Sequence, residues 1–479
     1  MTAAHAPTPH DASPEQALGA IRAHRGPLLL DLDETLYLRN STEDFIDTVR
    51  PRLLALLLLR LLDALRPWRW TGGEATRDNW RVRLVVLCFP RTGGRWSARV
   101  ATLAGAFANR PLIEALRAPD AAPVIVTAGF DTIVAPLVAA LGLPRARILA
   151  ARLGHPADRR DGKLARVRGA LGEQALRRAL VLTDSADDLE LLDACARPLR
   201  TVWPQARFSA ALGGVYLPGQ YLTQVKRPGT RYIVRGILQE DFAFWVLASV
   251  TLAAQPLLHV LGLLFLLVSF WAIYERGYVD NDLVAAHLEA APTLSAAFHE
   301  HPVATPAVQP WLWALACGAA GAVLLRWPAW PSVLDLEIWT LVLVATHAWF
   351  ALYNRLDKAT RVWLFGGLQF ARAAAFTALV PVTPVGALAL AAHVLSRWVP
   401  YHVYRLAGRD WPEAPLHLMR LLFFVVLAAL LGIAEGVAAL FGASALALLA
   451  WNLYRARREL AAVCAAATRL DRAPPEDRR

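Results

Sequence analysis

Carboxylates follow two short apolar runs in the first half of the chain. The stretch "PLLLDLDET" places Asp31 and Asp33 after one run, and "ALVLTDSADD" places Asp184 and Asp188 after another. Acids two residues apart on an extended strand end point the same way. One can attack phosphorus while the other transfers a proton, and further carboxylates complete an oxygen-rich Mg²⁺ site. The pattern therefore predicts magnesium-dependent phosphate chemistry.

These acids need a scaffold that brings distant segments together. Apolar runs of strand length at 27–32, 122–130 and 179–192 are separated by helical patterns. This alternation predicts an α/β domain with a parallel sheet, which binds ligands at the carboxyl ends of its strands. Thr127 falls at such an end, and its hydroxyl can hold a phosphate oxygen together with a lysine.

Four motifs in order over residues 27–200 resemble those of the haloacid dehalogenase-like phosphohydrolases. The resemblance implies a Rossmann-like domain, with Asp31 as nucleophile and Asp33 as general acid/base. It also implies phosphate contacts by Thr127 and by Lys163 in "DGKLARV". Mg²⁺ would be held by four acids, Asp31, Asp33, Asp184 and Asp188. Thr183 departs from the fourth motif, which often has glycine there.

An acid at the second position of the first motif implies a phosphatase. The insert at about 39–120 resembles the helical cap of some members of the family. Its stretch "PRLLALLLLRLLDALRPWRW" (51–70) is too short to span a bilayer before charges interrupt it. Two interpretations stay open: a buried cap helix, or an interfacial helix with Trp68 and Trp70 near the lipid headgroups.

The composition indicates a chain with a water-soluble half and a membrane half. Of the 479 residues 56% are hydrophobic, and the net charge is +11. Basic residues cluster at the ends of long apolar runs, which favours a membrane partner over nucleic acid. The four cysteines are scattered, so neither a disulfide framework nor a zinc site is predicted.

The predicted organisation has five parts. They are an N-terminal tail (1–25), the phosphatase domain (26–216), a linker at the membrane face (217–239), a transmembrane domain (240–455) and a tail (456–479). About eight spans are expected, with cores at 240–256, 258–275, 309–326, 336–353, 362–380, 383–398, 418–434 and 437–454.

Positive charge predicts the orientation of these spans. The loop with Arg355, Lys358 and Arg361 and the tail beginning at Arg455 are basic, whereas alternate connections carry almost no Lys or Arg. By the positive-inside rule both termini are cytoplasmic. No signal peptide is recognised at the N-terminus. We therefore expect a multi-pass protein of the inner (plasma) membrane.

A second group of acids lies where predicted spans reach the cytoplasm. One cluster contains Glu275, Asn281, Asp282 and Glu289, and the next cytoplasmic loop contributes Asn354 and Asp357. Acids at a bilayer boundary are costly unless they bind a cation. Two such clusters facing one another can hold Mg²⁺ against a diphosphate.

Residues 225–455 resemble the UbiA-type intramembrane prenyltransferases. "NDLVAAHLE" keeps Asn281, Asp282 and Glu289 of their first motif, although Ala285 replaces a middle acid, and "YNRLD" keeps Asp357 of the second. The resemblance implies an all-α helix bundle with Mg²⁺ at Asp282, Glu289 and Asp357. Expected substrate contacts are Glu275, Asn281, Asn354, Arg361, Gln369 and Arg372, although Arg372 can equally be a structural partner for a carbonyl or for His347.

Two classes of function remain open. The first is a bifunctional enzyme that transfers a prenyl group, or transfers onto a polyprenyl phosphate, and hydrolyses a phosphate ester through a phosphoaspartate. Its partners would be an isoprenoid diphosphate or polyprenyl phosphate and the bilayer. The alternative is a membrane-anchored phosphatase whose helix bundle is an anchor or a lipid transporter.

Overall fold

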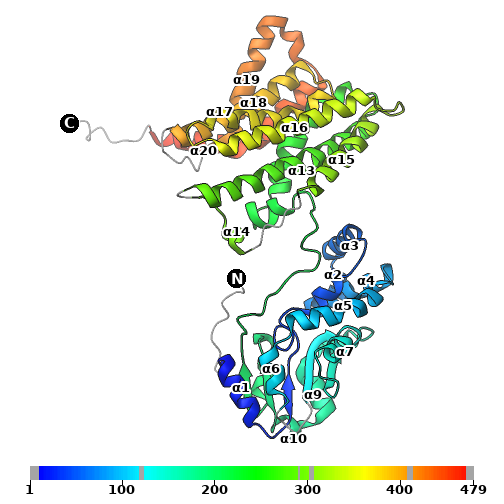
Figure 1. Cartoon of the computed structure of the whole chain (residues 1–479). Helices are drawn as coiled ribbons and strands as arrows, with labels where there is room; N and C mark the ends of the chain where they lie inside the picture. Colours follow the sequence, from blue (N-terminus) through cyan, green and yellow to red (C-terminus); the bar gives the residue numbers. More distant parts are fainter. Residues whose placement is uncertain (1–9, 118–122, 290–291, 301–306, 407–413, 471–479) are drawn as a thin grey trace, which may run out of the picture. The chain divides into compact units, whose positions relative to one another are not determined.

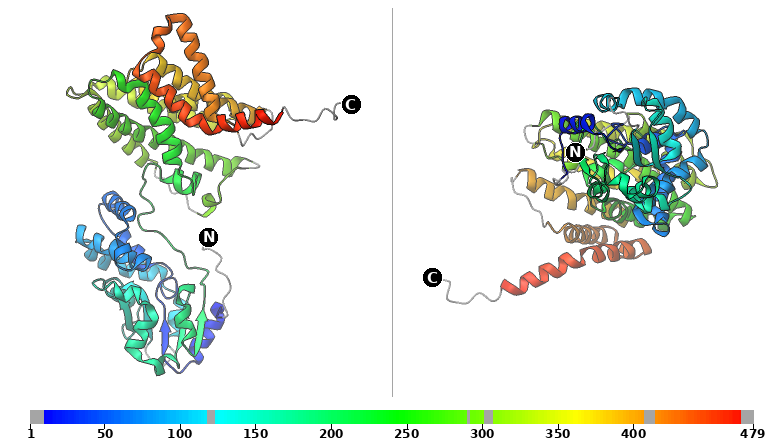
Figure 2. Two further views of the ribbon diagram at one scale, coloured as in Figure 1. Left: turned by 180° about the vertical axis from the view of Figure 1, so that it is seen from behind. Right: turned by 90° about the horizontal axis from the view of Figure 1, so that it is seen from below.

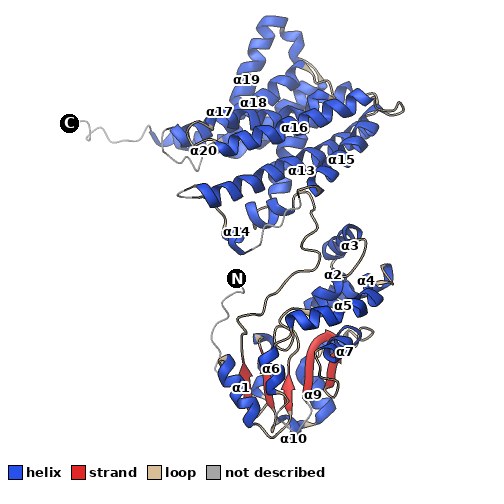
Figure 3. Cartoon of the chain, viewed as in Figure 1, coloured by secondary structure: helices blue, strands red, loops and turns tan. Residues whose placement is uncertain are grey.

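The computed structural model describes residues 10–117, 123–289, 292–300, 307–406 and 414–470. The chain divides into two compact units, Met1–Val215 and Tyr216–Arg479 (Figure 1). The first unit mixes helices and strands, whereas the second is helical (Figure 3). The predicted fold class, an α/β domain followed by an all-α bundle, is confirmed.

A five-stranded parallel sheet forms the centre of unit 1, in the order β3-β2-β1-β4-β5. The strands are β1 (Leu28–Leu30), β2 (Val124–Phe130), β3 (Arg147–Ala151), β4 (Leu180–Thr183) and β5 (Arg197–Arg200). In β1 every residue is buried, because helices cover both faces of such a sheet. Leu29 lies opposite Val124 of β2 and Val181 of β4, so the ends of the three predicted strands meet.

The helices of unit 1 fall into two sets. Between β1 and β2 lie α2 (Ser41–Asp47), α3 (Arg52–Leu65), η1 (Pro67–Trp70), η2 (Gly73–Thr76), α4 (Arg77–Cys88), α5 (Thr92–Phe107) and α6 (Arg110–Ala115). The others are α1 (Pro14–Ala23), α7 (Asp131–Ala140), α8 (Ala157–Arg160), α9 (Gly162–Leu171), α10 (Glu173–Leu176), η3 (Ala186–Asp188) and α11 (Leu189–Asp193). Helices α2–α5 of the first set lie on the side of the sheet to which the strands point (Figure 3). The expected cap (39–120) covers this set, and its last three residues lie outside the described ranges.

Unit 2 is a bundle of helices. They are η4 (Leu222–Lys226), η5 (Ile233–Phe242), α12 (Ala243–Ser249), η6 (Val250–Leu252), α13 (Pro256–Leu288), α14 (Ala296–Glu300), α15 (Gln309–Arg326), α16 (Val333–Arg355), α17 (Val362–Ala374), η7 (Ala375–Ala378), α18 (Pro384–Leu406), α19 (Leu416–Glu435), η8 (Val437–Leu440) and α20 (Ala443–Leu470). Helix α13 packs against α15 and α16, and α18 packs against α17 and α19. Glycine permits α13 and α15 to approach closely, because a Cβ at Gly321 would lie 2.9 Å from the carbonyl oxygen of Gly262. The expected linker (217–239) contains η4 and the start of η5, so it is partly helical, and it belongs to unit 2.

Within the described part of the chain, three helices are long and apolar enough to cross a membrane. They are α13, α16 and α19, and they coincide with the predicted cores 258–275, 336–353 and 418–434. Helices also occupy the other predicted cores, but they do not meet the same criteria of length and composition. Membrane association is thus supported, and the number of passes stays a prediction.

Candidate active site

Asp31 directly follows the central strand of the sheet. Its backbone N–H donates to the carbonyl oxygen of Leu182 at 2.9 Å, which continues the β1–β4 ladder by one residue. The side chain is 8% exposed, and its Oδ1 accepts a hydrogen bond from the N–H of Leu32 at 2.8 Å. The backbone thus holds this carboxylate at the carboxyl edge, where parallel sheets bind ligands.

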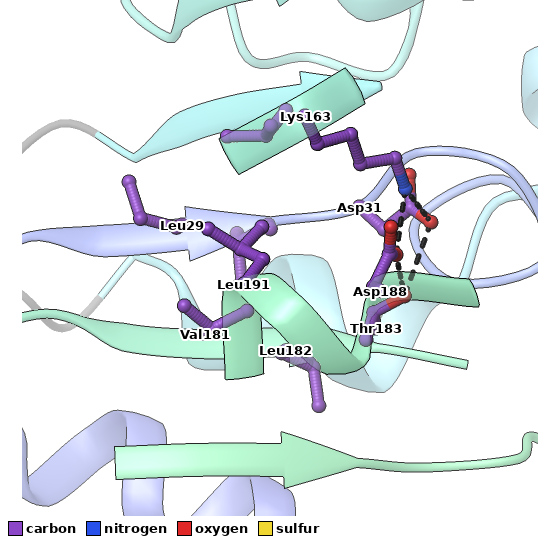
Figure 4. Close-up of a pocket in the computed structure, with 10 residues that line it drawn as sticks. Leu29, Asp31, Lys163, Val181, Leu182, Thr183, Asp188 and Leu191 are labelled. Carbon is purple, nitrogen blue, oxygen red and sulfur yellow. Dashed lines mark hydrogen bonds and ion pairs between the residues drawn. The ribbon is translucent and has the colours of Figure 1, made fainter. Parts of the chain in front are cut away.

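Lys163 lies between two of the predicted acids. Its Nζ is 2.7 Å from Oδ2 of Asp31 and 2.7 Å from Oδ2 of Asp188 (Figure 4). Thr183 donates to the same Asp188 oxygen at 2.6 Å and to Asp31 at 3.2 Å. Lys163 is the second residue of α9, which begins at Gly162, whose φ of +83° suits glycine. The three predicted residues and Thr183 therefore form one buried group, in which a single ammonium lies between two carboxylates.

Asp33 is held on the other side of the loop after β1. Its Oδ1 accepts a hydrogen bond at 2.8 Å from the N–H of Ser41, at the start of α2. Burial raises the pKa of Asp33 to about 7, the negative charge of Asp31 adds to the rise, and the Ser41 bonds oppose it. A carboxyl group with this pKa can both donate and accept a proton near neutral pH.

Asp184 follows β4 and accepts a hydrogen bond from Oγ1 of Thr35 at 3.1 Å. Burial raises the pKa of Asp184 to about 7, and the charges of Asp31 and Glu34 raise it further. The pKa of Asp31 is raised by burial and by Asp188, although Lys163 opposes this effect. Acids that repel one another in this way are stabilised by a bound cation.

The carboxylate donors fit Mg²⁺, which prefers oxygen ligands. Among the described residues, however, the structure gathers no group of three or more His, Cys, Asp and Glu side chains into a metal-binding arrangement, in either unit. In unit 1 the ammonium group of Lys163 occupies the place between Asp31 and Asp188. Which of the four predicted acids would ligate the metal is therefore a prediction.

Thr127 lies in β2 and is buried. Its Oγ1 accepts a hydrogen bond from the N–H of Gly129 at 3.0 Å. A Cβ built on Gly129 would meet both this oxygen, at 3.3 Å, and Oγ of Ser41, at 3.4 Å. The Ser41 side chain is fully buried, and it also helps to lower the pKa of Asp33. Sequence reasoning missed Ser41 and Thr35, and the only signal was the Asn40 cap that starts α2 beside the motif.

A small pocket adjoins this group. Apolar side chains of β1, β4 and α11 form its floor, and Asp31, Lys163, Thr183 and Asp188 form its polar end (Figure 4). Leu29, Val181 and Leu191 in this floor belong to a buried core that also includes residues of α9. The charged group is therefore fixed on a rigid apolar base.

In unit 2, residues 216–226 form hydrogen bonds with two of the acids predicted at the membrane rim, Glu275 and Asp282. Glu275 accepts hydrogen bonds from Tyr216 Oη at 2.6 Å and from the N–H groups of Gly219 (2.8 Å) and Leu222 (2.7 Å). Asp282 accepts hydrogen bonds from Tyr221 Oη at 2.7 Å and from the side-chain amide of Asn281 at 3.3 Å. Its carboxylate also lies 2.5 Å from Nζ of Lys226. These groups fix residues 216–226 onto α13.

Protein groups engage the other two acids predicted as metal ligands in unit 2. Glu289 pairs with Lys358 at 3.1 Å and with Arg361 at 3.2 Å. Asp357 is exposed, and its carboxylate accepts from the N–H groups of Ala359 and Thr360. The structure thus brings Glu289 and Arg361 together. The positive charge beside Glu289 is supplied by Lys358 and Arg361 of the loop that carries Asp357, at the place where Mg²⁺ was expected.

The remaining predicted substrate contacts are buried within the bundle. Asn354 donates to the carbonyl oxygen of Gly277 at 3.4 Å, and Gln369 is 4% exposed. Arg372 pairs with Asp241 at 2.7 Å and donates to the carbonyl oxygen of Gly236 at 2.8 Å. Arg372 therefore has a structural partner of one expected kind, a backbone carbonyl. Its ion pair with Asp241 was not predicted.

Sequence reasoning missed a second buried charged group. Glu240 forms salt bridges with Arg420 and Arg455, and Arg420 also donates to Asn452 at 2.8 Å. His393 lies 3.5 Å from Asp241. The available signal was the presence of ionisable residues within apolar runs, where they face a bundle interior and pair with one another.

Comparison with known proteins identifies the first unit only. Residues 28–193 match the family model of the haloacid dehalogenase-like hydrolases. No UbiA family model matches unit 2. No curated protein and no solved structure matches the chain. The match covers strands β1 to β4, the insert and the charged group around Asp31, so residues 28–193 form a haloacid dehalogenase-like hydrolase domain.

Proposed function

We propose that the chain is a membrane-associated, Mg²⁺-dependent phosphohydrolase that cleaves phosphate monoesters through a phosphoaspartate at Asp31. One observation carries the proposal. A buried carboxylate at the end of the central strand is bonded to Lys163 at 2.7 Å, and Asp33, two residues on, has a pKa of about 7. Such a pair supplies a nucleophile and a proton carrier.

Each residue has a distinct role in this reaction. Oδ of Asp31 attacks phosphorus, and Asp33 donates its proton to the departing oxygen. The same Asp33 then removes a proton from the water that hydrolyses the acyl phosphate. Lys163 and the hydroxyl of Thr127 hold phosphate oxygens. Mg²⁺, held by Asp31, Asp184 and neighbouring acids, would neutralise charge on the phosphoryl group.

An isotope experiment tests the covalent step. The full chain in lipid nanodiscs is mixed with a ³²P-labelled phosphate monoester and Mg²⁺, and the reaction is quenched in acid before it is complete. Hydrolysis through a phosphoaspartate leaves ³²P on the peptide containing residue 31, and hydroxylamine should release it, whereas direct attack by water leaves the peptide unlabelled. Asp31→Asn should lose activity, and Asp131→Asn, at an exposed carboxylate of α7, should keep it.

For unit 2 we propose, as a second activity, UbiA-type transfer of a prenyl group or transfer onto a polyprenyl phosphate. The observation that favours it is a polar rim formed by distant segments, in which Glu289 of the α13 end meets Lys358 and Arg361. Asn281 and Asp282 lie about two turns earlier, within α13. Transfer would make a phosphorylated lipid product that Asp31 then dephosphorylates.

This second activity is tested with labelled prenyl diphosphates and polyprenyl phosphates, Mg²⁺ and purified chain in nanodiscs. Transfer should survive Asp31→Asn and disappear in Asp282→Asn. If wild type forms no labelled product while it hydrolyses phosphate esters, unit 2 is an anchor or a lipid transporter. Placement of both termini in the cytoplasm, at the inner membrane, belongs to the same proposal and is tested by labelling cysteines added at each end.

A further inference from the structure

Helix α3 of the hydrolase domain has two leucine faces. Ala55, Leu56, Leu59 and Leu62 are buried, on the side that packs against α4. The opposite side exposes five leucines, by 39–66% of their surface: Leu53, Leu54, Leu57, Leu61 and Leu65. Spacings of three and four residues place the last four of these on one stripe. A contiguous apolar stripe on a water-soluble domain marks an interaction site.

Basic and aromatic residues border the stripe. Arg60 lies within α3, and Arg66 and Arg69 follow it; all three are exposed, and none forms a salt bridge with a described residue. The acid of the helix, Asp63, is already paired with Arg77 at 2.7 Å. Trp70, at the end of η1, is 83% exposed. This segment thus joins an apolar stripe, an exposed indole and unpaired positive charge.

The sequence leaves open that Trp68 lies near the lipid headgroups, but in the structure its indole is buried. Trp68 is 2% exposed, and its Nε1 donates to Glu74 at 3.0 Å. Trp68 therefore anchors η1 within unit 1, which leaves Trp70 as the aromatic residue available to a partner. Both interpretations of the 51–70 stretch hold in part, since one face of α3 is buried and the other is open.

We propose that α3 and η1 dock the hydrolase domain onto the anionic surface of the bilayer that holds unit 2. Leucines and a tryptophan beside unpaired arginines match an interfacial helix, which buries its apolar face at the acyl boundary and its cations among headgroups. The bilayer is also the partner that this chain always has nearby, because candidate spans follow in the same polypeptide.

The docking surface belongs to the insert that lies beyond the carboxyl ends of the strands. Helix α3 occupies one end of unit 1, away from the sheet, in two views that differ by a half turn (Figure 2). Docking through this insert turns the strand ends, and the group around Asp31, toward the lipid headgroups. The inference goes beyond the proposed hydrolysis and does not depend on it.

Spin-label accessibility tests the proposal on the full chain. Leu61→Cys is labelled in a background with serine at Cys88, Cys195 and Cys464, and the protein is placed in nanodiscs of phosphatidylcholine and phosphatidylglycerol. We expect the label to collide with oxygen more than with a water-soluble nickel chelate. Val202→Cys, at a residue 55% exposed in the same unit, serves as the control and should show the opposite preference.

Two results would overturn docking on lipid. A label at residue 61 open to the nickel chelate means that α3 lies free in water. A label protected from both reagents means that protein covers it, either unit 2 or a second copy. A second variant carries Leu57→Glu and Leu61→Glu, and its spin label is at Leu65→Cys. In this variant the label should collide more with the nickel chelate than with oxygen. That variant should keep the amide exchange rates of wild type in β1 and β4, which shows that it folds.

Discussion

Replacement of Asp33 by asparagine separates proton transfer from nucleophilic attack. The side chain keeps its size and can still accept the hydrogen bond from the N–H of Ser41 that now measures 2.8 Å. It cannot carry a proton to the leaving group. The loss in kcat/KM should therefore depend on how strongly the leaving oxygen needs to be protonated, and not on how tightly the phosphate binds.

The pKa determines how much acid is available. With a pKa of about 7, about one quarter of Asp33 is protonated at pH 7.5, whereas the usual value of 3.8 would leave about 1 molecule in 5,000 protonated. General acid catalysis contributes about 10²–10⁴ in rate. Because the proton donor must be protonated, kcat/KM for alkyl phosphates should fall about tenfold per pH unit above pH 7.

The assay compares two substrates on wild type and Asp33→Asn in nanodiscs with Mg²⁺. An alkyl phosphate, whose alkoxide leaves only with a proton, should lose about 10²–10⁴ in kcat/KM. p-Nitrophenyl phosphate, whose phenolate is a good leaving group, should lose far less in the phosphorylation step. The variant should also lose the alkaline decline. Equal losses on both substrates, or a decline that persists unchanged in the variant, would refute the role of Asp33.

Three further substitutions have defined outcomes. Lys163→Met leaves two buried carboxylates uncompensated, so we expect a loss of about 3–5 kcal/mol, read as faster amide exchange in β1 and β4; Mg²⁺ should restore part of the protection, and exchange equal to wild type would contradict the bridge. Gly129→Ala brings a Cβ within 2.8 Å of Val134 Cγ2; overpacking should cost about 1–3 kcal/mol, and Val134→Ala should rescue it, both followed by exchange in β2. Arg372→Met strands the Asp241 carboxylate and should lower thermal stability in detergent by about 3–5 kcal/mol, whereas the double variant with Asp241→Leu should recover most of it; equal damage in both would exclude the pair as the cause.

The parts of the fold that were predicted are those with an uninterrupted apolar pattern. Strands β1, β2 and β4 read as buried runs, because both of their faces are covered. Strands β3 and β5 did not, since β3 begins with an arginine and β5 reads "RPLR". They are the two edge strands of the sheet, where one side lacks a neighbour and polar residues are tolerated.

In the candidate site, too, some residues were predicted from the sequence and others were not. The positions of Asp31 and Asp184 after two apolar runs predicted a shared site, because a parallel sheet brings strand ends together. Lys163 was predicted from the resemblance to the family's motifs. The hydroxyls of Thr35 and Ser41 were missed, since their role depends on how the loop after β1 turns back toward β4 and β2. No local pattern encodes that turn.

In unit 2 the sequence located charged residues but not their partners. Acids at the end of an apolar helix predict a bound cation, and the sequence cannot distinguish Mg²⁺ from Lys226 or Arg361. The pairing of Asp241 with Arg372 joins residues 131 positions apart. It arises from the packing of η5 and α17, which composition and periodicity do not determine.

The insert enters the fold after β1 and leaves it before β2, two strands that are hydrogen-bonded neighbours. Its two attachment points are therefore adjacent, and the sheet closes correctly whatever lies between them. Evolution can replace such a module, and so change which molecules the enzyme accepts, without moving the nucleophile. A protein engineer has the same freedom: a graft that replaces α3 should remove the exposed leucine stripe and leave Asp31 in its place at the end of β1.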